Sequence, residues 1–122
     1  MPADNKTFKI KEGVSITDEV VAIIAGLAAT EVEGVSSLEG NLKNQALEKA
    51  GYKKLSKGVM VNISENEELY IRISINTEYG GEIPEICKQV QDKVKSTVEN
   101  MTGLVVTNVD VIVSSVILDN IE

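Results

Sequence analysis

The sequence predicts an α+β fold: a two-layer sandwich in which two main helices cover one face of a mostly antiparallel sheet. An apolar helical segment that meets a glycine and continues as an apolar strand occurs twice, at "LAATEVEGV" and at "VENMTGLVV". Between them, apolar and polar residues alternate on both sides of "ENEE", which indicates a hairpin with one buried face. The resulting order is typical of a ferredoxin-like βαββαβ arrangement, with an insertion at about residues 40–57.

The composition fits one small domain without disulfides. A chain of 122 residues can bury a core unaided, and with 3% aromatic residues that core is expected to consist of Val, Ile, Leu and Ala. One cysteine cannot form an internal disulfide, and the lack of histidine removes the commonest general base and metal ligand. We see no signal peptide, and the most apolar stretch, residues 20–29, is about half a bilayer span. We expect a cytoplasmic protein with a disordered leader at 1–7, one domain at 8–118 and a short tail at 119–122.

The N-terminal part is expected to form an edge strand and the first helix. "FKIKEGV" alternates weakly, as a strand does, and Ser15 or Thr17 can cap the helix that follows. Gly34 is expected to end this helix, because glycine adopts a left-handed C-cap at low cost. The predicted core face of the helix consists of Val20, Ile23, Ile24, Leu27 and Ala28.

The C-terminal part is expected to form a hairpin, the second helix and a long last strand. The hairpin buries alternate residues of "VMVNI" and "LYIRISI". Pro84 suits the first turn of the helix, and Gly103 suits its C-cap. The predicted apolar stripe of the helix is Ile83, Ile86, Cys87, Val90, Val94, Val98 and Met101. The predicted apolar face of the last strand is Val105, Val109, Val111 and Val113.

No catalytic, cofactor-binding or metal-binding residues are predicted. Cys87 lies on the apolar stripe with no histidine to activate it, so we interpret it as structural. Gly80–Gly81 resembles the start of a phosphate loop, but the acidic residues after it would repel an anion, so a plain turn is expected. A sheet that binds RNA would expose aromatic residues, and only Tyr70 is available. A metal chaperone would need a Cys-x-x-Cys loop, which is missing.

Two features indicate partners instead. The first helix is apolar or small nearly all round, and Ala22, Gly26 and Ala29 form a strip of small residues where a second copy could pack closely. The net charge of −7 argues against nucleic acid in general. A local cluster of lysines could nevertheless hold an anionic partner, or simply be a solvated loop; its members are Lys43, Lys49, Lys53, Lys54 and Lys57.

The chain resembles the alkaline-shock (general-stress) protein family of Gram-positive bacteria, as a small member without long charged tails. The resemblance runs from about Phe8 to Val116 and is carried by "ITDEVVAIIAGLAATEVEGV", "SKGVMVNI" and "YGGEIPEICKQVQDKVKSTVENMTGLVVTNVDVIV". Its most specific parts are Tyr79-Gly80 before a Val-Gln-x-x-Val helix, and Thr102-Gly103-Leu104 before the valine-rich strand.

This resemblance implies a non-enzymatic cytoplasmic protein that self-associates and serves stress response and cell-envelope homeostasis. It also implies that a small membrane-embedded partner could hold the protein at the membrane, with no cofactor and no catalytic residues. The alternative hypothesis is a regulatory module that binds an anionic partner, such as a lipid-metabolism enzyme, an anionic lipid or nucleic acid, through the lysine-rich segment 43–57.

Overall fold

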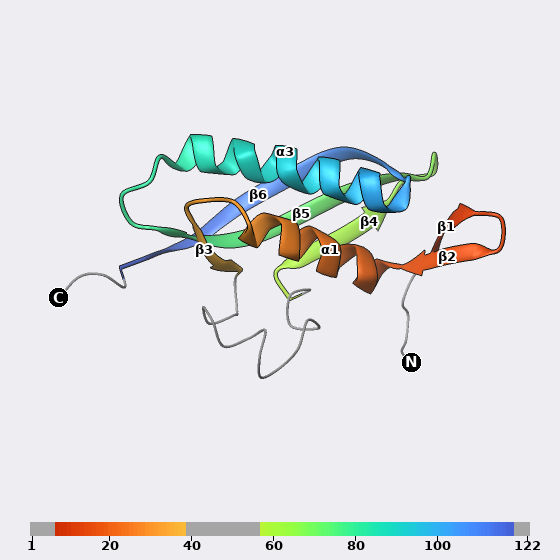
Figure 1. The fold of residues 1–122 in the computed structure, drawn as a ribbon, viewed down its shortest axis with the longest axis horizontal. Helices are drawn as coiled ribbons and strands as arrows, with labels where there is room; N and C mark the ends of the chain where they lie inside the picture. The colour runs from red at the N-terminus through yellow and green to blue at the C-terminus, as the bar shows by residue number, and fades with distance from the viewer. Residues whose placement is uncertain (1–6, 39–56, 119–122) are drawn as a thin grey trace.

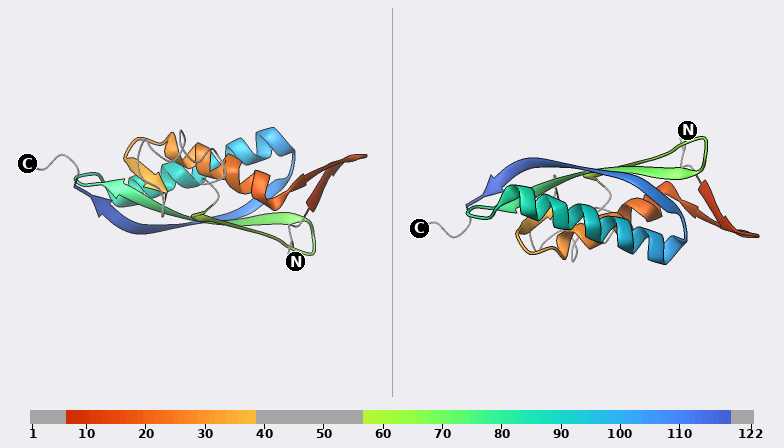
Figure 2. Two further views of the ribbon diagram at one scale, coloured as in Figure 1. Left: turned by 90° about the horizontal axis from the view of Figure 1, so that it is seen from below. Right: turned by 90° about the horizontal axis from the view of Figure 1, so that it is seen from above.

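The computed structural model describes residues 7–38 and 57–118, and its two helices lie on the same face of one sheet (Figures 1 and 2). The α+β two-layer fold class is therefore confirmed. The elements in chain order are β1 (Thr7–Lys11), β2 (Val14–Thr17), α1 (Asp18–Thr30), β3 (Val35–Leu38), β4 (Val59–Ile63), β5 (Glu68–Glu78), α3 (Ile83–Thr102) and β6 (Val105–Ile117).

Strand β5 is the centre of the main sheet. Strand β6 pairs with it in parallel along its whole length. On the other edge, β4 pairs antiparallel with Leu69–Ile73 and β3 pairs antiparallel with the end of the strand, up to Thr77. Among the described residues, β6 has a strand on one side only, so it forms an edge of this sheet.

The first strand was predicted at the edge of this sheet, but it lies in a two-stranded sheet of its own. β1 pairs antiparallel with β2, and Phe8 lies opposite Ile16. Gly13 has a positive φ of 80°, which lets the chain turn back on itself at once. The first strand therefore ends in a hairpin before α1, and the edge of β5 opposite β6 is occupied by β3 and β4.

Helix α1 begins as predicted, since the Thr17 hydroxyl accepts a hydrogen bond from the Val20 amide at 3.2 Å. Its predicted core face was wrong at Val20, which is 42% exposed, whereas Ala28 is buried and Ile24 and Leu27 pack partly against the core. The helix packs against α3 as well as against β3 and β4, so small residues occupy its buried side. The buried residues are Val21, Ala22, Ala25, Gly26, Ala28 and Ala29. The helix also ends earlier than predicted, at Thr30, and Gly34 (φ 100°) makes the turn into β3.

Helix α3 buries the middle of its predicted stripe. Ile86, Val90, Val94 and Val98 are buried, together with Thr102. The stripe was too long at its ends, because Ile83 is 39% and Met101 is 65% exposed, and Cys87 within it is only half-buried. Pro84 lies in the first turn, and Gly103 is the left-handed C-cap, as predicted; its N–H donates to the Glu99 carbonyl at 2.9 Å.

The predicted hairpin is confirmed, and four residues of β5 are fully buried under the helices: Leu69, Ile71, Ile73 and Ile75. The face of β6 was predicted wrongly at one residue. A β-bulge at Thr107 shifts the alternation, so Val106 is fully buried and Val105 is 51% exposed. Beyond the bulge, Val109 is buried, while Val111 and Val113 pack partly against the core.

Candidate functional site

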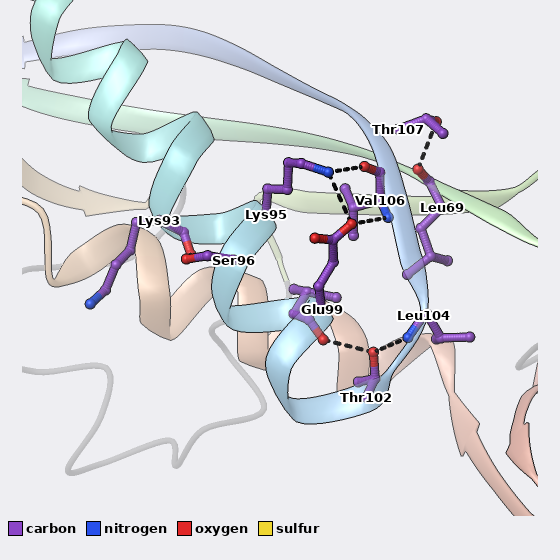
Figure 3. Close-up of polar contacts among 10 residues, drawn as sticks. Leu69, Lys93, Lys95, Ser96, Glu99, Thr102, Leu104, Val106 and Thr107 are labelled. Carbon is purple, nitrogen blue, oxygen red and sulfur yellow. Dashed lines mark hydrogen bonds and ion pairs between the residues drawn. The ribbon is translucent and has the colours of Figure 1, made fainter.

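The outer edge of β6 divides into two parts that differ in how their main-chain groups are bonded. In the first part, residues 105–109, side chains of α3 bind the main chain (Figure 3). The Val106 N–H donates to Glu99 Oε2 at 2.9 Å, and Lys95 Nζ donates to the Val106 carbonyl at 2.8 Å. Gln91 Nε2 donates to the Val109 carbonyl at 2.9 Å. We call residues 105–109 the capped half of β6.

The spacing along α3 explains this capping. Gln91, Lys95 and Glu99 follow one another at intervals of four residues, so they lie on one side of the helix, next to the buried stripe. Lys95 Nζ also contacts Glu99 Oε2 at 2.9 Å. The hydrogen bond from the Val106 N–H, and then the hydrogen bond from Lys95, lower the pKa of Glu99. Both interactions favour the charged carboxylate, which holds the start of β6 against the helix.

The second part of the edge, residues 111–117, is called here the open half of β6. In the described part of the chain, no side chain of α3 hydrogen-bonds to β6 beyond Val109. The side chains of this half become exposed: Ile112 is 44% and Val116 is 43% exposed, and Leu118 just after the strand is 51% exposed. No charged residue occurs from Val111 to Leu118. An uncharged apolar strand at a sheet edge is a surface that other strands can pair with.

The sheet face opposite the helices carries polar groups that bind one another. Tyr70 Oη donates to Asp110 Oδ2 at 2.6 Å, and Arg72 Nη2 donates to Tyr70 Oη at 3.5 Å. The aromatic ring that was considered for RNA stacking is thus tied to a carboxylate.

A buried amide connects three strands near the C-terminal end of β5. Asn76 Nδ2 donates to Ser37 Oγ at 2.9 Å and to the Leu38 carbonyl at 3.3 Å. On the other side, the Ser115 hydroxyl donates to Asn76 Oδ1 at 2.8 Å. The amide therefore links β3, β5 and the open half of β6. A satisfied network of this kind stabilises one arrangement of the strands.

The glycines before α3 have a packing role. A Cβ atom on Gly81 would lie 2.7 Å from Ile86 Cδ1, and a Cβ atom on Gly34 would lie 2.6 Å from the same atom. Ile86 thus fits between two glycines, and Gly80 has a positive φ of 99° in the turn. These contacts favour the interpretation of Gly80–Gly81 as a packed turn, and they disfavour its interpretation as a phosphate-binding loop.

The small-residue strip predicted for self-association does not lie on the surface. Ala22 is 4% exposed, Ala29 is fully buried and Gly26 is buried too. Residues packed inside one protomer offer no contact to a second copy in this conformation, so self-association stays a prediction whose surface must lie elsewhere. Of the lysine cluster, only Lys57 is described, and it is exposed. Lys43, Lys49, Lys53 and Lys54 lie outside the described residues, and an anionic partner stays a prediction.

The cysteine and the acidic residues described in the structure form neither an activated nucleophile nor a metal site. Burial raises the pKa of Cys87, which keeps the thiol protonated and weakly nucleophilic. Within the described ranges, no group of three or more His, Cys, Asp or Glu residues could hold a metal ion. The helices described here are too short or too polar to cross a membrane.

Comparison with known proteins identifies the family. The family profile of the alkaline-shock proteins, described as having a cell envelope-related function, matches residues 6–118. The chain belongs to this family. YloU of Bacillus subtilis is 34% identical over 109 residues, which cover 88% of this chain and 90% of that protein. YqhY of the same organism is 33% identical over 98 residues, or 80% of this chain and 72% of that protein. Both relatives are described as uncharacterized proteins.

A more distant relative and two solved structures extend the comparison. Spy1535 of Streptococcus pyogenes is 29% identical over 106 residues, or 87% of this chain and 80% of that protein. Two solved structures of MamM CTD variants each have a TM-score of 0.50 and 11% sequence identity. They cover 80% of this chain, with 95% and 94% of their own chains. At this identity the likeness is one of fold alone.

Proposed function

We propose that this protein is a non-enzymatic interaction module in cell-envelope homeostasis, which acts as a self-associating scaffold. The observation that carries the proposal is the open half of β6, where Ile112 and Val116 are exposed in an uncharged stretch that continues into the exposed Leu118. Apolar residues grouped at an exposed sheet edge are typical of a surface that another protein covers. The cell envelope-related function of the family supports the biological context.

The described chemistry supports an interaction role over a catalytic one. The thiol of Cys87 has a raised pKa, so it is a poor nucleophile at neutral pH. The carboxylate with a lowered pKa, Glu99, is engaged by a main-chain N–H and by Lys95. Neither group is therefore arranged as a catalytic nucleophile or base.

Membrane recruitment through a partner protein belongs to the same proposal. A small membrane-embedded protein would hold the scaffold at the cytoplasmic side of the membrane, as the resemblance to the alkaline-shock proteins implies. The protein itself would then need no apolar span among its helices.

The test has two parts. Sedimentation velocity of the purified protein should show association that increases with protein concentration. Tagged protein in Bacillus subtilis cells should fractionate with the membranes, and membranes treated with protease beforehand should lose the capacity to bind added protein. A protein that stays monomeric at every concentration and remains in the soluble fraction would contradict the proposal. Substrate turnover by the purified protein would overturn its non-enzymatic part.

A further inference from the structure

We propose that the open half of β6 pairs edge to edge, in antiparallel orientation, with the same residues of a second copy of this chain. This inference rests on the self-association proposed above and names its surface. It would join the sheets of two protomers into one continuous sheet.

The main-chain geometry of β6 shows which groups are available. Val106 and Val109 face the helices, and the main-chain groups that α3 binds belong to these two residues. Main-chain groups of successive strand residues alternate in direction, so residues on the helix face direct theirs away from β5. Val111 and Val116 are on the helix face as well, opposite Ile73 and Thr77 of β5. Their outward N–H and C=O groups can therefore bond to another strand.

The side chains favour a second copy as the occupant. Val116 is exposed on the helix face and Ile112 on the opposite face, so a strand that pairs here should carry no charged side chain on either face. The open half of β6 meets this requirement itself. The hairpin of β1 and β2 does not, because it carries Lys9, Lys11 and Glu12. Antiparallel pairing also leaves the capped halves of both copies at the two outer ends, where their side-chain caps do not interfere.

The β-bulge in the open half sets the register. Ser114 is the extra residue between the pairs Ile75–Val113 and Asn76–Ser115, and it shifts the alternation of faces by one residue. If the two copies are related by a two-fold axis that passes between Val113 and Ser114, the residues that pair across the axis lie on the same face of the joined sheet. Val111 lies opposite Val116 of the second copy on the helix face, and Ile112 lies opposite Ser115 of the second copy on the other face.

The size of the contact sets the expected strength. A strand pair this short buries less than about 1,200 Å² in total, which is typical of weak and reversible complexes. The dimer is therefore expected to dissociate on dilution, and sedimentation has to cover a wide range of protein concentrations.

The first test compares two lysine substitutions on one strand and one face. Ile112→Lys removes the Ile112–Ser115 cross-strand contact twice and places two charges at the joined edges, which should raise the dimer dissociation constant roughly 10-fold. Val105→Lys is the matched control: Val105 is 51% exposed on the same face of β6, but it lies in the capped half. This variant should dimerise like the wild type. Circular dichroism and thermal melts should show that both variants are folded, since both side chains are exposed.

The second test measures the register directly. In a Cys87→Ala background, Ile112→Cys combined with Ser115→Cys should give a disulfide-linked dimer under mild oxidation, because these positions would face each other across the axis. The background with Val105→Cys alone should not cross-link efficiently.

The outcomes separate this inference from the proposed function. A wild type that associates while Ile112→Lys leaves its association unchanged would overturn the β6 surface and leave the scaffold proposal standing. A wild type that is monomeric at high concentration would overturn both. Weakening by Val105→Lys equal to that by Ile112→Lys would also overturn the β6 pairing, because the capped half should make no contact.

Discussion

Removal of the Glu99 carboxylate should destabilise the protein more than the loss of an ordinary surface ion pair on the same helix. Glu99→Ala removes the acceptor of the Val106 N–H bond at 2.9 Å and the partner of Lys95 at 2.9 Å. The main-chain bond is half-buried, and such bonds contribute about 1–1.5 kcal/mol. The ion pair at a spacing of four residues adds about 0.3–0.5 kcal/mol. The free energy of unfolding should therefore fall by about 1.3–2 kcal/mol.

The matched control is Asp92→Ala. Asp92 pairs with Lys88 at 3.1 Å on the same helix and with the same spacing, but both side chains are about 70% exposed and the structure gives Asp92 no main-chain partner. This variant should lose at most about 0.5 kcal/mol. Urea unfolding at neutral pH and one fixed protein concentration gives both values. Equal losses for the two variants would refute the claim that Glu99 acts mainly through the edge of β6.

The pH dependence of the same variant follows from the direction of the pKa shift. Folding lowers the pKa of Glu99 below its ordinary value of 4.5, so the carboxylate contributes stability above that pH. The contribution is lost as pH falls through the lower folded-state pKa. The difference in unfolding free energy between wild type and Glu99→Ala should thus be constant near neutrality and shrink in acid below about pH 4.5. A difference that grows in acid would contradict this assignment.

Three further predictions concern packing and reactivity. Gly26→Leu should unfold or strongly destabilise the protomer in a thermal melt, because Gly26 is buried; a stable monomer would show that the site has room. Gly34→Ala should lower the free energy of unfolding, measured by urea titration, more than Gly103→Ala does. Both glycines have positive φ, but only at Gly34 would the new Cβ meet Ile86, at 2.6 Å, and equal effects would argue against that contact. Cys87 should react with iodoacetamide several-fold more slowly than free cysteine at pH 8, since burial raises its pKa; equal rates would show an accessible thiol.

The sequence alone determined the fold class and most of the elements, because local patterns encode them; strand β2 was not predicted. Alternation in "LYIRISI" reflects a strand with one buried face, and all four of its apolar residues are fully buried. Gly103 marked the end of α3, since only a left-handed residue closes the helix there. The resemblance to the alkaline-shock proteins was also readable, because it depends on the order and spacing of short motifs, and the family is confirmed.

The tertiary structure decided which apolar surfaces are inside and which are free. Helix α1 is apolar nearly all round, so its sequence could not show that the side with Gly26 is buried while Val20 is exposed; contact with both α3 and the sheet decides this. Bulges depend on pairing between distant strands, which is why Val105 was assigned to the wrong face. The spacing of Gln91, Lys95 and Glu99 at intervals of four residues puts them on one side of α3, but the sequence does not show what they bind. In the folded protein β6 runs parallel to β5 and beside α3, so the main chain of Val106 and Val109 comes within hydrogen-bond distance of these three side chains. This tertiary contact is what distinguishes the capped half of β6 from the open half.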